Sequence, residues 1–153
     1  MTIPSMMPAD RGRWMAIDWG ERRIGLARSD DTQTLASPLD TLVRRDGKRF
    51  PMPVFLKLVA LHRPVGLVIG LPLSLEGEEN DSTRAARELA ELVGRRTGLP
   101  VDLWDERMST ARALGAIREQ EGSTRGRRED VDALAASVLL QHYLDARRGS
   151  AVR

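Results

Sequence analysis

The sequence contains no cysteine, and His62 and His142 are the only two histidines among its 153 residues. The absence of cysteine excludes disulfide bonds and zinc sites built from thiolates. Two histidines are too few for a histidine-rich metal site, so any bound metal would be held by oxygen ligands. Oxygen ligands favour magnesium or manganese over zinc or copper.

Long hydrophobic runs are also absent. No apolar stretch approaches the roughly 20 residues that a membrane span requires, and the first residues lack the apolar segment of a secretory signal. We therefore expect a cytoplasmic protein with no membrane partner. The length predicts a single domain over residues 13–148, with a flexible tail at 1–12 and a short C-terminal tail at 149–153.

Positive and negative charges nearly balance, with 24 lysines and arginines against 22 aspartates and glutamates. The arginines are nevertheless clustered, and one glycine-containing segment holds Arg125, Arg127 and Arg128. Such runs are commonly just solvated faces. Since the sequence pI is about 9.6, a nucleic acid backbone is the first partner to consider.

The most informative stretch lies between Trp14 and Asp30. Residues 14–17 form a short apolar run typical of a buried strand, and Asp18 ends it. A polar turn and a second apolar run at 24–27 complete a predicted hairpin. Burying a carboxylate on a core strand is costly unless it is paired or binds a cation. Asp18 is therefore a candidate for chemistry, although an aspartate that only ends a strand and bonds the next turn fits equally well.

The remaining pattern predicts an α/β domain with one mixed central sheet and helices on both faces. A third antiparallel strand is expected at 35–42, where Pro38 favours a sheet edge or a bulge. Further buried strands are predicted at 65–70 and 101–104. Helices are predicted at 54–61, from Ser82 to about 97, from Ser109 to about 120, and from about Asp130 onward, after a mobile segment at 121–129.

The final helix carries a predicted apolar stripe, which consists of Val131, Leu134, Ala135, Val138, Leu139 and His142. Asp132 lies at the flank of this stripe. An acid in the first turn of a helix can simply complement the helix dipole. Asp130 is the better candidate for the N-cap, however, so capping leaves Asp132 less explained.

Asp18 and Glu106 each lie at or just past the end of an apolar strand, the edge at which open α/β sheets bind ligands. Asp132 is the third candidate acid. Three carboxylates at one edge would repel each other unless divalent cations neutralised them. The pattern therefore predicts one or two Mg²⁺ or Mn²⁺ ions, an arrangement suited to phosphodiester hydrolysis.

Five ordered motifs also carry a family resemblance: Ile17-Asp18-Trp19-Gly20 with Arg23-Ile24-Gly25, Ala36-Ser37-Pro38-Leu39, Gly70-Leu71-Pro72, residues 104–110 and residues 131–136. The chain resembles the YqgF (RuvX-like) family, whose members are described as Holliday junction resolvases and as pre-16S rRNA nucleases. The resemblance covers roughly residues 13–148. It departs from the family pattern at Trp19, Ser74 and Met108, none of which is an acid of the site.

The resemblance implies a ribonuclease H-like fold and a metal-dependent endonuclease with an acidic triad at Asp18, Glu106 and Asp132. The expected substrates are the 5′ end of pre-16S rRNA, branched DNA, or both. Arg23 and Arg107 would contact phosphates or pair with neighbouring acids. The cluster of Arg125, Arg127 and Arg128 would bind the nucleic acid backbone without sequence specificity.

Three alternatives remain open at this point. Symmetric cleavage of a four-way junction needs two active sites and hence a homodimer, whereas trimming an rRNA end does not. The chain could also be a nucleic-acid-binding module without catalysis, against which the three intact acids count. The turn after Asp18 also resembles the phosphate-binding hairpin of actin-like ATPases, but those proteins close two such domains around a nucleotide and 153 residues supply one.

Overall fold

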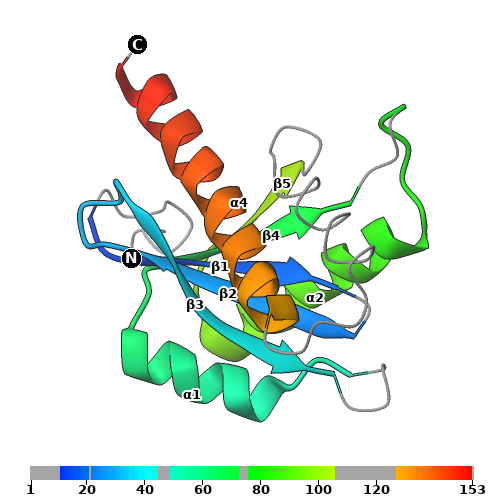
Figure 1. Cartoon of the computed structure of the whole chain (residues 1–153). Helices are drawn as coiled ribbons and strands as arrows, with labels where there is room; N and C mark the ends of the chain where they lie inside the picture. The colour runs from blue at the N-terminus through cyan, green and yellow to red at the C-terminus, as the bar shows by residue number, and fades with distance from the viewer. Residues whose placement is uncertain (1–10, 21, 45–48, 73–75, 106–126, 153) are drawn as a thin grey trace.

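The computed structural model describes residues 11–152 except 21, 45–48, 73–75 and 106–126, and it describes the backbone alone at 127–130 and 150–152 (Figure 1). The described residues form five strands and three helices. The strands are β1 (Trp14–Trp19), β2 (Arg23–Ser29), β3 (Ala36–Val43), β4 (Gly66–Leu71) and β5 (Val101–Asp105). The helices are α1 (Met52–His62), α2 (Asp81–Thr97) and α4 (Arg127–Val152).

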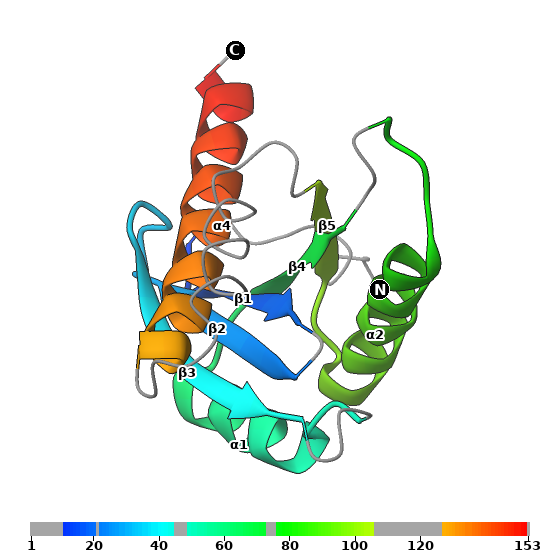
Figure 2. The same cartoon turned by 45° about the vertical axis from the view of Figure 1, so that its right-hand side comes forward.

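The strands form one sheet in the order β3-β2-β1-β4-β5. The pairs β1/β2 and β2/β3 are antiparallel, whereas β1/β4 and β4/β5 are parallel. Helices α1 and α2 cover one face and α4 covers the other (Figure 2). This arrangement confirms the predicted α/β domain with a mixed sheet and helices on both faces.

The predicted hairpin is confirmed, and Asp18 lies opposite Gly25 in its register. Strand β3 is an edge strand of the described sheet, and its register with β2 shifts after Leu26, which pairs with Asp40 while the next residue pairs with Pro38. Proline has no N–H and cannot donate a hydrogen bond to a neighbouring strand, so it is tolerated in a sheet only at an edge or at a bulge. The position of this proline is both.

Helix α2 begins one residue before the predicted start at Ser82, because its N-cap is Asn80. The backbone N–H of Thr83 donates to Asn80 Oδ1 at 3.0 Å, and the Asn80 N–H donates to Thr83 Oγ1 at 3.2 Å. Together these two bonds form a capping box. The helix ends as predicted at Gly98, which adopts a left-handed conformation with a φ of 72°.

Helix α4 differs from its prediction in two ways. It begins at Arg127, so the predicted N-cap at Asp130 is wrong and the predicted mobile segment overlaps the helix at 127–129. Its buried face includes Asp132 at 0% exposure, whereas Leu134 is 43% exposed. The predicted stripe was chosen mainly for apolar residues and left out Asp132 and Ser137, whose polar side chains are buried, so the true buried face is shifted around the helix. No helix among the described residues is long and apolar enough to cross a membrane.

Alternation along β1 assigns its side chains to the two faces. Met15 and Ile17 belong to the core under α1 and α2, and Trp14 and Ala16 belong to the core under α4. Asp18 continues the second series and therefore lies on the face that α4 covers. The sheet thus presents this carboxylate to the helix that carries Asp132.

We expect Asn80→Ala to lower the free energy of unfolding by about 0.5–2 kcal/mol, because Thr83 loses its capping acceptor. Ser82→Ala is the matched control: Ser82 is exposed, and its replacement should change stability by less than about 0.5 kcal/mol. Urea denaturation of both variants measures the difference. A larger loss for Ser82→Ala than for Asn80→Ala would contradict Asn80 as the N-cap.

Candidate active site

Asp18 lies at the carboxyl end of β1 and is 6% exposed. Strand β4 runs parallel to β1 and ends at Leu71, which pairs with Asp105 at the end of β5. Asp18 therefore occupies the edge of the sheet that the sequence predicted for ligand binding.

Asp132 comes to the same place from α4. A Cβ atom added to Gly25 would lie 2.0 Å from the carbonyl oxygen of Asp132, so the helix backbone rests directly on β2 at this glycine. Gly25 is also the sheet partner of Asp18, and paired Cα atoms in antiparallel strands are about 4.5–5.5 Å apart. Gly25 thus lies between β1, which carries Asp18, and α4, which carries Asp132.

Arg23 forms an ion pair with the buried acid. Its Nε donates to Asp132 Oδ2 at 2.5 Å, and the Arg23 side chain is 18% exposed whereas that of Asp132 is fully buried. Buried charges are generally paired, because an isolated one would lose its hydration without compensation. Of the two contacts that the sequence suggested for Arg23, pairing with a neighbouring acid is therefore the one observed.

Several predicted site residues fall outside the described residues. Glu106, Arg107 and Arg125 are among them, and the side chains of Arg127 and Arg128 are not described although their backbone forms the first turn of α4. Among the described residues there is no group of three acidic or histidine side chains that could hold a metal ion. The described part of the site is the pair Asp18 and Asp132 together with Arg23.

Arg44 supports the turn beside Asp18, a role that the sequence analysis missed. Its guanidinium carbon lies 4.1 Å from the centre of the Trp19 ring, and its Nη1 donates to the Gly20 carbonyl at 2.8 Å. Trp19 also packs on Phe50, with 5.7 Å between the ring centres. These contacts depend on how β3 pairs with β2, which no local pattern encodes.

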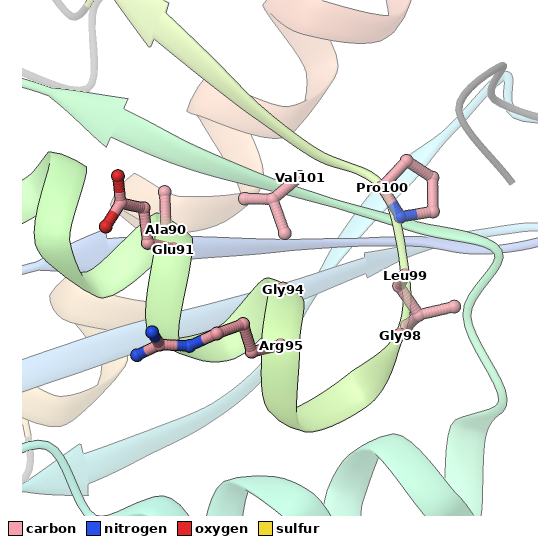
Figure 3. A pocket seen from close by; sticks show the side chains of 8 residues that line it. All are labelled: Ala90, Glu91, Gly94, Arg95, Gly98, Leu99, Pro100 and Val101. Carbon is pink, nitrogen blue, oxygen red and sulfur yellow. The ribbon is translucent and has the colours of Figure 1, made fainter.

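A pocket of about 630 Å³ lies elsewhere, between the end of α2 and the start of β5 (Figure 3). Its lining residues fall between Ala90 and Val101 and include one acid, Glu91, and one base, Arg95. The pocket lies at the amino end of β5, far along the strand from the carboxyl edge. It is therefore not part of the carboxylate site.

Comparison with known proteins gives a consistent family. Residues 12–146 match the model of the family described as RuvX, Holliday junction resolvase. A relative from Koribacter versatilis is 40% identical over 91% of this chain and 90% of its own length, and one from Anaeromyxobacter sp. is 42% identical over 88% and 98%. Both carry the name "Putative pre-16S rRNA nuclease".

Solved structures of RuvC from Thermus thermophilus share the fold. The complex of RuvC with a Holliday junction substrate has a TM-score of 0.51 and 16% identity, and covers 90% of this chain and 96% of RuvC. A second RuvC structure gives a TM-score of 0.52 and 17% identity with the same coverage. These matches confirm the predicted ribonuclease H-like fold.

We expect Gly25→Ala to destabilise the protein by about 1–3 kcal/mol, because the new methyl group would collide with the backbone of Asp132 and push α4 off the sheet. Denaturant unfolding measures this loss. Gly94→Ala in α2 is the control: its Cβ would meet Val101 at an ordinary 3.5 Å, and alanine favours a helix by up to about 1 kcal/mol. Equal stability of Gly25→Ala and the unmodified protein would contradict the close contact.

Proposed function

This chain belongs to the RuvX family of Holliday junction resolvases, and we propose that it hydrolyses phosphodiester bonds in structured nucleic acid at the site of Asp18 and Asp132. The assignment as a nuclease follows from the family and from the names of its relatives. The observation that carries the location is the burial of two carboxylates at one sheet edge, on either side of Gly25.

The chemistry of these side chains fits a hard divalent cation. Carboxylate oxygens are the ligands that Mg²⁺ and Mn²⁺ prefer, and Asp18 and Asp132 bring two buried carboxylates, at 6% and 0% exposure, to one sheet edge. In this proposal Asp18 and Asp132 hold the ion, and Glu106, which follows β5 directly in sequence, is the third ligand. When bound, such ions activate a water and stabilise the leaving oxygen.

The protein's own residues have further roles in the proposal. Asp18 and Asp132 would hold the ion at the edge of the sheet, and the hairpin turn braced by Arg44 keeps Asp18 in place. Arg107, Arg125, Arg127 and Arg128 contact the nucleic acid backbone, which gives affinity without sequence specificity. Arg23, which faces Asp132, is not assigned to a phosphate.

The substrate that we favour is precursor 16S rRNA in the cytoplasm. The relatives that carry this name are about 40% identical and match nine-tenths of the chain. The family description favours a second substrate, a four-way DNA junction. The two differ in one requirement, because symmetric junction cleavage needs two active sites and therefore a homodimer.

We expect Asp18→Asn to reduce cleavage by at least about 100-fold, because even groups that only support a metal ligand contribute about 10–100-fold. The measurement is cleavage of labelled precursor 16S RNA and of labelled junction DNA with Mg²⁺ or Mn²⁺. Chelation with EDTA should abolish it for either substrate. The molar mass in solution, determined in parallel, tests whether junction cleavage coincides with a dimer.

Asp81→Asn is the matched control, because the Asp81 side chain is 95% exposed and pairs only with Arg84 in the described structure. It should cleave at the unmodified rate. Unchanged cleavage by a folded Asp18→Asn protein would refute the site, and an unmodified protein that cleaves neither substrate would refute the function.

A further inference from the structure

We propose that Arg23 is a positioning residue: it is a counter-cation that holds the buried Asp132 carboxylate in the metal-free protein. The inference deepens the proposed function, in which Asp132 holds the ion. The stability that it assigns to the pair does not depend on nuclease activity.

The inference rests on where Arg23 and Asp132 lie and on how closely they approach each other. The 2.5 Å separation of Arg23 Nε and Asp132 Oδ2 is short even for a charge-assisted hydrogen bond. Asp132 has no exposed surface and its carbonyl is pressed against Gly25, so it cannot turn outward into water. Arg23 lies two residues before Gly25 on the same face of β2. Both partners are thus fixed on elements that pack directly on each other.

The charges near the pair favour a cation at this place. Asp18 is the second buried acid at this edge, opposite Gly25. Removing one partner of a buried ion pair is strongly destabilising, because the remaining charge has lost its compensation. If Arg23 is replaced by an uncharged side chain, the folded state should therefore depend on a divalent cation more than the unmodified protein does.

An arginine that contacts substrate would behave differently. Its loss weakens nucleic acid binding and lowers the dependence of binding on salt, because a phosphate contact disappears. It leaves the stability of the free protein largely unchanged. Stability without metal and affinity for nucleic acid therefore separate the two roles of Arg23.

The test uses the full chain with Arg23→Met, which keeps a long apolar side chain but removes the charge and the donors. In EDTA we expect its Tm to fall by about 10 °C. Excess Mg²⁺ or Mn²⁺ should recover a large part of this loss while raising the Tm of the unmodified protein little. Arg23→Lys, which retains the charge, should recover much of the loss in EDTA.

Two further variants separate charge from packing. Arg28→Met is the matched control on the same strand: Arg28 is also partly buried but lies on the opposite face, in the series of Ile24 and Leu26. It should show no dependence on metal. The double variant Arg23→Met with Asp132→Asn removes the buried charge together with its partner, so its Tm in EDTA should exceed that of Arg23→Met.

Binding of labelled RNA and junction DNA in EDTA completes the test, and Arg23→Met should bind both within about twofold of the unmodified protein. An unchanged Tm with binding weakened tenfold would make Arg23 a phosphate contact and overturn the proposal. Failure of the double variant to recover would also overturn it, because the loss would then be one of packing.

Failure of the proposed function would be visible separately. If metal raises the Tm of Arg23→Met no more than that of the unmodified protein, Asp132 is not the acid that holds the ion, whereas recovery by the double variant still supports the role of Arg23. If the unmodified protein cleaves neither substrate, the nuclease proposal fails and the stability results still decide the inference.

Discussion

The site depends on one steric fact, the absence of a side chain at Gly25. The carbonyl of Asp132 occupies the space that a Cβ would need, so α4 rests on the backbone of β2. A second glycine has the same effect beside β1, where Gly66 leaves room for the Trp14 ring. That ring packs at a tilt of 57° against Tyr143 of α4, with 5.1 Å between the ring centres. Two close contacts along one helix therefore fix how α4 lies across the sheet.

The close packing of α4 on β2 also leaves a buried negative charge, which Arg23 compensates. Asp132 under this helix has no exposed surface, and a buried carboxylate requires a cation or hydrogen-bond donors. Buried ion pairs seldom stabilise a fold more than well-packed apolar residues would. Retaining two acids at this depth is thus better explained by chemistry at the edge of the sheet than by stability.

Local signals in the sequence predicted most of the fold. Alternation and turn residues identified the hairpin, Pro38 indicated an edge or a bulge, and Gly98 marked the end of α2, because each of these signals acts within a few residues. The buried face of α4 was mispredicted, since a buried Asp132 counts as polar in any apolar pattern. Its ion pair with Arg23 spans 109 residues of sequence, and no local pattern encodes such a contact.

Fold and chemistry support different parts of the functional argument. RuvC shares the architecture at 16–17% identity, and a shared fold alone does not determine the reaction. In the proposed function the chemistry lies instead in the side chains of Asp18 on β1 and Asp132 on α4, both of which are buried. In that proposal a phosphate approaches the two acids along the carboxyl edge of the sheet, where Asp18 ends β1. The chain leaves this edge after Leu71 and after Asp105. In the proposed function the hydrolytic step therefore depends on how β1 and α4 hold these two acids, and the fold alone supplies the frame on which they meet.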